Sequence, residues 1–117
     1  MKRILVVDDE ENIRMLYQEE LQEEGYEVTA ASNGNEALDV LSKGGPFDLV
    51  TLDIRMPGMD GINTVRAIKE KYQGLAVVLV TAYGEYKQDF STWASDAYIV
   101  KSADLTELKA TIKRIIG

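Results

Sequence analysis

The sequence predicts an α/β domain in which a parallel sheet of five strands is covered by five helices on its two faces. Short, continuous apolar runs alternate along the chain with stretches in which apolar residues recur every three or four positions. The apolar runs have the composition of strands that are buried on both faces, as in parallel sheets. Regular alternation of strands and helices favours right-handed crossovers and a sheet between two helical layers. The length of 117 residues suits one domain.

The five strands are expected at the apolar runs, and the helices between them. The predicted strands are residues 4–7, 27–31, 48–52, 75–80 and 97–100. The predicted helices are residues 10–24, 35–43, 60–72, 85–94 and a last one that begins near residue 104. The helical pattern is weakest in the fourth of these segments.

Particular residues mark several helix boundaries. Gly25 suits the position just after the first helix, where a left-handed backbone is common. Asn33-Gly34 is a turn signal before the second helix. Asp60 suits the N-cap of the third helix, and Asp104 with Glu107 suits a capping box at the start of the last one.

Composition limits the chemistry that the chain can perform. There is no cysteine and no histidine, so any metal site must use oxygen ligands, which favour magnesium, calcium or manganese. A net charge of −7 disfavours direct binding to nucleic acid or to an anionic membrane. No apolar stretch approaches the length of a membrane span, and the N-terminal run is too short for a signal peptide. We therefore expect a cytoplasmic protein.

Polar residues that could bind a metal or take part in a reaction follow four of the five predicted strands at their carboxyl ends. They are Asp8 and Asp9, Asp53, Thr81, and Lys101. Because the carboxyl ends of parallel strands meet at one edge, these groups are expected to converge there. A cluster of carboxylates needs a compensating cation, and Mg²⁺ suits oxygen ligands. A divalent ion, an ammonium and a hydroxyl around Asp53 suit phosphoryl transfer to that carboxylate.

Each of these residues has a plain structural explanation when it is taken alone. Aspartate after a strand often caps a turn, a threonine there is usually structural, and a single lysine is usually a solvated surface charge. The joint placement at successive strand ends favours the functional interpretation.

Several stretches of the chain resemble response-regulator receiver domains. They are Val6–Glu10, Asn33–Leu38, Asp53–Gly61, Thr81–Ala82 and Tyr98–Lys101. The nine residues Asp-Ile-Arg-Met-Pro-Gly-Met-Asp-Gly that begin at Asp53 are the most specific of these. The resemblance extends over nearly the whole chain and implies one receiver domain, residues 1–117. It also implies a doubly wound, flavodoxin-like sheet with strand order 2-1-3-4-5.

The resemblance implies a role for each acidic residue of the site. Asp53 corresponds to the phospho-accepting carboxylate, which receives phosphate from a histidine kinase or a histidine phosphotransferase. Asp9 corresponds to a direct Mg²⁺ ligand, and Asp8 to a ligand that acts largely through water. Asp53 itself and the backbone carbonyl of Arg55 correspond to the remaining protein ligands of the metal.

The resemblance also implies a switch. Lys101 corresponds to the residue that pairs with Asp53 or its phosphate, and Thr81 to one that moves to hydrogen-bond the phosphoryl group. Tyr98 corresponds to an aromatic residue that swings inward behind it, which is a two-state element biased by local charge. Output is then expected through contact with a downstream protein, from a monomer or a weak, phosphorylation-dependent dimer. Such a domain catalyses only its own phosphorylation and dephosphorylation.

The sequence departs from the family pattern in two places. Ser102 stands where the family usually has proline after the lysine, and the stretch between Thr81 and Tyr98 is about two residues short. The phosphorylation chemistry therefore transfers better than the partner surface. Three alternatives stay open: a degenerate receiver that binds partners without phosphorylation, an Mg²⁺-dependent phosphohydrolase with an aspartate nucleophile, and a receiver cut from a longer regulator.

Overall fold

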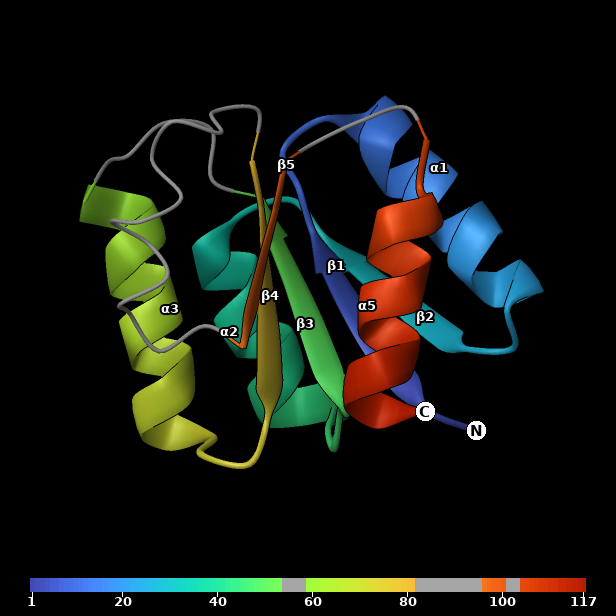
Figure 1. Ribbon diagram of the computed structural model, residues 1–117. Helices are drawn as coiled ribbons and strands as arrows, with labels where there is room; N and C mark the ends of the chain where they lie inside the picture. Colours follow the sequence, from blue (N-terminus) through green and yellow to red (C-terminus); the bar gives the residue numbers. More distant parts are fainter. Residues whose placement is uncertain (54–58, 82–95, 101–103) are drawn as a thin grey trace.

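The computed structural model describes residues 1–53, 59–81, 96–100 and 104–117, with backbone alone at 59–62 and 81 (Figure 1). Along these ranges the elements are β1 (Arg3–Val7), α1 (Glu11–Glu23), β2 (Glu27–Ala31), α2 (Gly34–Gly44), β3 (Leu49–Asp53), α3 (Met59–Lys71), β4 (Ala76–Thr81), β5 (Ala97–Val100) and α5 (Thr106–Ile116). The predicted helix over residues 85–94 lies outside the described residues.

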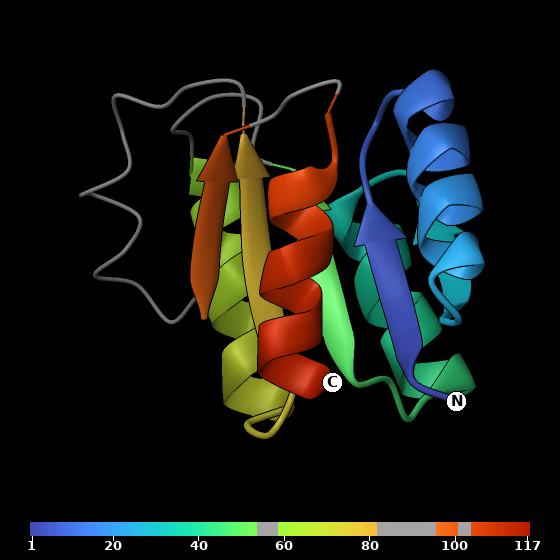
Figure 2. The same ribbon diagram turned by 45° about the vertical axis from the view of Figure 1, so that its right-hand side comes forward.

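The five strands form one parallel sheet in the order β2-β1-β3-β4-β5, which confirms the predicted fold. Helices α1 and α5 cover one face of the sheet, and α2 and α3 cover the other (Figures 1 and 2). Among the described residues, none of the helices has the length and apolar character that crossing a membrane would require.

Alternation of side chains along the strands produces two cores, one on each face of the sheet. The core under α1 and α5 includes Ile4, Val6, Tyr17, Leu21, Leu49, Val78, Val80, Ile99, Leu108 and Ile112. The core under α2 and α3 includes Leu5, Val7, Ala37, Leu41, Val50, Leu52, Val65, Ile68, Val77, Leu79 and Tyr98. Neighbouring residues such as Ile4 and Leu5 are both fully buried, one in each core. Burial on both faces explains why the strands are continuous apolar runs.

Two of the predicted helix boundaries form as capping structures. Gly25 has φ +97°, and its amide donates to the carbonyl of Gln22 (3.0 Å) while the Tyr26 amide donates to Leu21 (3.3 Å). These two bonds make a Schellman motif, for which glycine is the preferred residue. Asn33, predicted in a turn, is the N-cap of α2, and its side-chain oxygen accepts from the Glu36 amide at 2.8 Å.

Two predicted helix starts are wrong by one or two positions. Helix α3 begins at Met59, so Asp60 lies inside its first turn and is not the N-cap. Helix α5 begins at Thr106, and its N-cap is Leu105, one residue after the predicted Asp104. Asp104 instead accepts from the Thr106 amide (3.0 Å) and hydroxyl (2.6 Å). A carboxylate stabilises a helix from several places near its first turn, so the sequence does not distinguish these positions.

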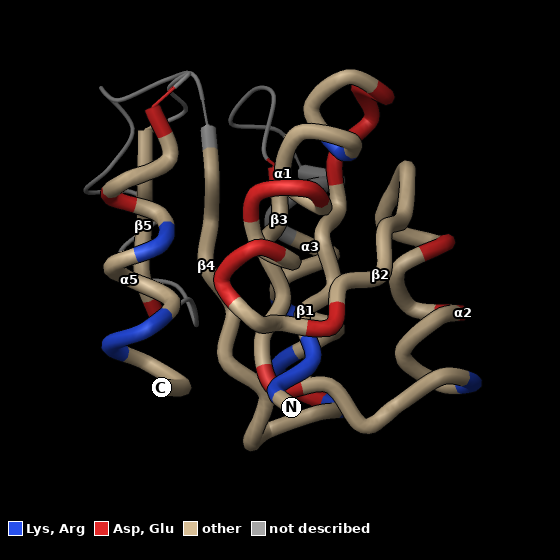
Figure 3. Tube along the Cα trace, turned by 90° about the vertical axis from the view of Figure 1, so that its right-hand side faces the viewer, with Lys and Arg blue, Asp and Glu red and all other residues tan. Residues whose placement is uncertain are grey.

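Helices α1 and α5 carry net charges of opposite sign, since acidic residues predominate in α1 and basic residues in α5 (Figure 3). Lys109 of α5 forms an ion pair with Glu20 of α1, with 2.6 Å between Nζ and Oε1. The hydrogen bond to Glu20 raises the pKa of Lys109. The ion pair therefore adds stability below the ordinary lysine pKa and loses it as pH rises through the raised value.

Aspartates at the start of β3 and β5 bind the neighbouring strand with both backbone and side chain. The Asp48 amide donates to the Arg3 carbonyl, and Asp48 Oδ2 accepts from the Arg3 amide, each at 2.8 Å. The Asp96 amide donates to the Val77 carbonyl (2.7 Å), and Asp96 Oδ2 accepts from the Val77 amide (2.8 Å). Lys69 of α3 also donates to Asp96 Oδ2 (3.1 Å). We call Asp48 and Asp96 the strand-start aspartates.

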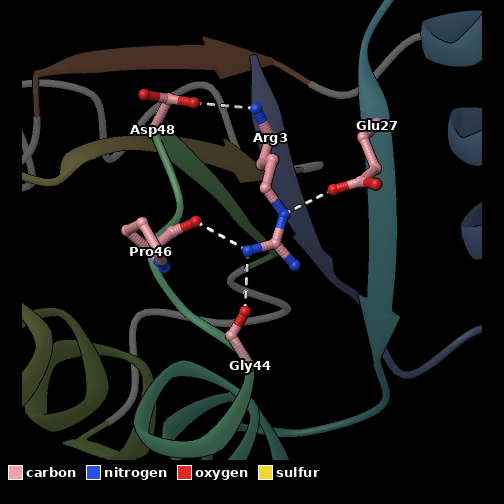
Figure 4. Close-up of polar contacts among 5 residues, drawn as sticks. All are labelled: Arg3, Glu27, Gly44, Pro46 and Asp48. Atoms are coloured by element: carbon pink, nitrogen blue, oxygen red, sulfur yellow. Dashed lines mark hydrogen bonds and ion pairs between the residues drawn. The ribbon is translucent and has the colours of Figure 1, made fainter. Parts of the chain in front are cut away.

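The guanidinium of Arg3 makes hydrogen bonds at the same end of the sheet (Figure 4). Its Nη1 donates to the carbonyls of Gly44 (2.7 Å) and Pro46 (2.8 Å), and its Nε donates to Glu27 of β2. Together with Asp48, these contacts join β1, β2 and the chain between α2 and β3 at the end opposite the strand carboxyl ends.

Candidate functional site

The register of the sheet brings Asp8 and Asp53 to the same height on adjacent strands. Val7 of β1 pairs with Leu52 of β3, and these two aspartates are the next residues on each strand. Adjacent strands lie about 4.8 Å apart. Asp53 is partly buried, and its Oδ2 atom is inaccessible to solvent. The predicted meeting of these two carboxylates at the carboxyl edge is therefore compatible with the backbone that positions them.

Asp8 is held firmly in the protein. It is 3 % exposed, its amide donates to the Ala31 carbonyl (3.1 Å), and its Oδ1 accepts from the Glu10 amide (2.9 Å). Its own carbonyl accepts from the Arg14 guanidinium (2.8 Å). Hydrogen bonds to an ionised carboxylate are among the stronger ones in proteins, which makes this burial tolerable.

Asp8, Asp9 and Glu10 form a carboxylate cluster at the end of β1. One carboxylate oxygen from each residue lies within 4.8 Å of those from the other two. Three negative charges at this separation repel one another, and a cation among them would relieve the repulsion. Oxygen donors are what a small, hard cation such as Mg²⁺ prefers, so the donor set fits that ion. Glu10 was not among the predicted site residues, although its position directly after the aspartate pair is a visible signal.

The other predicted site residues are placed only in part. Thr81 ends β4 and pairs with Val100, one position beyond the Asp53–Val80 pair, so its backbone reaches the same edge. Tyr98 lies opposite Leu79 and is buried in the core under α2 and α3. Its ring thus lies inward in this structure.

Three predicted positions fall in the stretches that the structure leaves undescribed. They are Arg55, Lys101 and Ser102. Lys101 directly follows Val100 in the chain. The roles predicted for these residues stay predictions.

Arg14 is a second residue that the sequence interpretation missed. It lies four positions after Glu10, which is the spacing of neighbours on one helix face, so the sequence contains a weak signal for it. Its contact is with the Asp8 backbone, and no residue pattern encodes such a contact.

A family model for the response regulator receiver domain matches residues 4–113. The chain belongs to this family. Among curated relatives of this receiver domain, sporulation initiation phosphotransferase F of Bacillus subtilis is 37 % identical, over 98 % of this chain and 94 % of that protein. Among solved structures, the regulator TrrA of Thermotoga maritima in complex with Mg(2+)-BeF is 52 % identical. It aligns over 98 % of this chain and 99 % of that chain, with a TM-score of 0.89.

A second structure contains TrrA in complex with the histidine kinase ThkA. The matched chain of that complex is 51 % identical to this chain. The alignment covers all of this chain and all of that chain, with a TM-score of 0.87. Other curated relatives are longer proteins. This receiver domain spans 25 % of the regulatory protein AtoC of Escherichia coli and 48 % of the transcriptional regulatory protein ResD of Bacillus subtilis. The resemblance inferred from sequence motifs is therefore confirmed at the level of the family and the fold.

Proposed function

We propose that this receiver domain accepts a phosphoryl group on Asp53 from a histidine kinase or histidine phosphotransferase and signals through a protein contact. The main support is the position of Asp53 at the carboxyl edge of the sheet, one strand away from the carboxylate cluster. The family membership supports the same assignment. We also propose that residues 1–117 form a single receiver domain.

In the proposed reaction, a carboxylate oxygen of Asp53 attacks the phosphorus of a phosphohistidine. A P–O bond forms as the P–N bond breaks, and the imidazole nitrogen keeps the electron pair of the broken bond. The product is an acyl phosphate on Asp53 and a free histidine. Partial burial of Asp53 limits the access of water to the new acyl phosphate.

The surrounding residues have supporting roles in this proposal. Asp8, Asp9 and Asp53, with the Arg55 carbonyl, would hold Mg²⁺, which when bound neutralises charge on the phosphoryl oxygens. TrrA, the structural neighbour, contains Mg(2+)-BeF, which supports this assignment. Lys101 would supply a second, fixed positive charge. Thr81 would donate its hydroxyl to the phosphoryl group and so couple phosphorylation to the inward position of Tyr98.

The phosphoryl donor must reach the carboxyl edge, and α1 begins at this edge (Figure 1). On α1, the apolar side chains of Met15 and Leu16 are 59 % and 36 % exposed, so a partner can reach them. We propose that they contact the histidine kinase. The complex of TrrA with the kinase ThkA supports a partner of this class.

The direct test measures the intact mass of the protein after incubation with acetyl phosphate. We expect one added phosphoryl group in the presence of Mg²⁺, and none with EDTA or in the Asp53→Asn variant. Asp39→Asn, the same substitution on the exposed surface of α2, is the matched control and should be phosphorylated like the parent.

Two outcomes would contradict the proposal. A parent protein that takes no phosphoryl group from acetyl phosphate or from a phosphorylated histidine phosphotransferase would favour a phosphorylation-independent binding module. Continuous hydrolysis of p-nitrophenyl phosphate that depends on Asp53 would favour a phosphohydrolase.

A further inference from the structure

Arg14 contacts the loop that contains the carboxylate cluster with both its backbone and its side chain. It lies in α1, and its amide donates to the Glu10 carbonyl at 3.0 Å, which is the first hydrogen bond of the helix. Its guanidinium Nη1 reaches back past Asp9 and donates to the Asp8 carbonyl at 2.8 Å in a partly buried contact. One residue thus spans the loop from the end of β1 to the first turn of α1.

The Asp8 carbonyl is part of the peptide group that joins Asp8 to Asp9. A peptide group is planar, so a hydrogen bond that fixes its oxygen also fixes the bond leading into the Cα of Asp9. The direction of that bond helps to set where the Asp9 carboxylate points. Asp8 is held on its other side by the Ala31 carbonyl and the Glu10 amide, but Asp9 and Glu10 are exposed. The loop backbone therefore helps to set the direction of these two exposed carboxylates.

The positive charge of Arg14 and its hydrogen bond should have opposite effects on Mg²⁺ affinity. A guanidinium stays positive at all ordinary pH values, and here it binds the main chain of the loop that contains the three carboxylates. This hydrogen bond goes to a main-chain oxygen, so it does not occupy a carboxylate ligand atom. By charge alone, a nearby cation disfavours a bound Mg²⁺. The positioning effect and the charge effect therefore predict opposite outcomes when Arg14 is replaced.

We propose that Arg14 is a positioning residue for the cation site, which holds the Asp8–Asp9 peptide so that the carboxylates of Asp8 and Asp9 face one cation. The inference rests on the proposed function, because it assumes that this cluster binds Mg²⁺. Residues that orient metal ligands without touching the metal typically change metal affinity by about 10–100-fold when they are replaced.

The test measures Mg²⁺ binding by isothermal titration calorimetry with MgCl₂, without any phosphoryl donor. Arg14→Met keeps much of the aliphatic stem and removes the donors, and we expect its Mg²⁺ Kd to rise about tenfold. Arg14→Lys keeps the charge and one donor group, and its Mg²⁺ Kd should lie between those of the parent and Arg14→Met. Arg114→Met is the matched control, because Arg114 is exposed in the last turn of α5 and its Kd should stay within about twofold of the parent.

Unchanged or tighter Mg²⁺ binding by Arg14→Met would overturn the inference, since loss of a nearby positive charge alone favours tighter binding. A lower melting temperature of Arg14→Met in EDTA combined with a parent-like Kd would show a merely structural role and would also overturn it. If Arg14→Met does not fold, Arg14→Lys decides, with a Kd raised at least about threefold expected and a parent-like Kd contradicting the inference.

A parent protein that binds no Mg²⁺ would instead overturn the proposed metal site itself. Parent-like binding in Arg14→Met leaves the proposed function intact, so the two failures are distinguishable.

Discussion

Single residues at the end of β1 create an electrostatic conflict in the absence of a cation. Asp8, Asp9 and Glu10 place three carboxylate oxygens within 4.8 Å of one another, although only Asp8 is buried. Like charges at this separation destabilise the folded state, and a bound cation removes that penalty. The same residues are thus unfavourable for metal-free folding and favourable for metal binding.

Replacing Asp9 with asparagine should therefore change stability little without magnesium and lower it with magnesium. In EDTA, we expect Asp9→Asn to be about as stable as the parent or more stable by up to about 1 kcal/mol, since exposed charge pairs contribute little. In Mg²⁺ at about 100 times the parent Kd, the parent should gain about 2.7 kcal/mol, most of which the variant lacks. Urea unfolding in both buffers measures the two differences. Equal gains from Mg²⁺ in both proteins would contradict a ligand role for Asp9.

Thr106 controls the ionisation of Asp104. Hydrogen bonds from the Thr106 hydroxyl and amide hold the pKa of the Asp104 carboxyl below its ordinary value. Thr106→Val removes the hydroxyl and should raise this pKa toward the ordinary aspartate value. Because a lowered folded-state pKa adds stability above the unfolded pKa and loses it as pH falls through the folded one, the variant should lose less stability on acidification. An NMR titration of the Asp104 carboxyl carbon measures the shift, and an unchanged pKa would exclude this role for the hydroxyl.

At the scale of elements, the sequence predicted the strands better than the helix starts. Each strand lies within one residue of its predicted bounds, because a strand buried on both faces is an uninterrupted apolar run. The common edge of the site residues follows from parallel topology alone. The starts of α3 and α5 were misplaced because Asp60 and Asp104 stabilise a helix from more than one position. Arg14 was missed because its partner is a backbone carbonyl, whose place depends on the folded loop.

Helices α2 and α3 approach closely at Gly34. A Cβ at this position would lie 2.5 Å from Thr64 Oγ1 and 3.2 Å from its Cγ2. Gly34→Ala should therefore destabilise the protein by about 1 kcal/mol, even though alanine is the better helix former. In a Thr64→Ala background the same change should be neutral or stabilising. A double-mutant cycle by chemical denaturation measures the coupling, and additive effects would mean that the contact relaxes freely.

Asp96 holds the N-terminal end of strand β5 against β4. This carboxylate receives hydrogen bonds from the Val77 amide and from Lys69, in addition to the backbone bond between Asp96 and Val77. Asp96→Ala should destabilise the fold by about 1–2 kcal/mol, because a hydrogen bond to a charged group is lost at a partly buried amide. Faster hydrogen exchange of the Val77 amide in Asp96→Ala than in the parent would show that the loss of stability is located at this contact. Asp39→Ala, at an exposed ion pair of α2, is the control and should change stability little.

In the whole molecule, both chain termini lie at the end of the sheet opposite the strand carboxyl ends (Figures 1 and 2). The candidate site and the ends of the chain are thus separated by the length of the sheet. Several curated relatives are longer than this receiver domain. The geometry allows chain to be added at either end without approaching the carboxylate cluster.

A folded fusion partner at the C-terminus should therefore leave the cation site unchanged. We expect the Mg²⁺ Kd and the rate of phosphorylation by acetyl phosphate to stay within about twofold of the unfused protein, because screening limits electrostatic effects over such distances. A fusion inserted between β2 and α2, beside Ser32, serves as the contrasting variant, since Ser32 follows directly after Ala31, whose carbonyl binds the Asp8 amide. Equal effects of both fusions would contradict the separation inferred here.

The hydrogen bond between Asp96 and Val77 has a consequence for the chain that precedes β5. Because Asp96 binds Val77 directly, the height at which β5 runs along β4 does not depend on how many residues precede it. The number of residues between Thr81 and Asp96 can then differ while Tyr98 still lies opposite Leu79. Insertions or deletions before Asp96 should therefore leave the register between β4 and β5 unchanged.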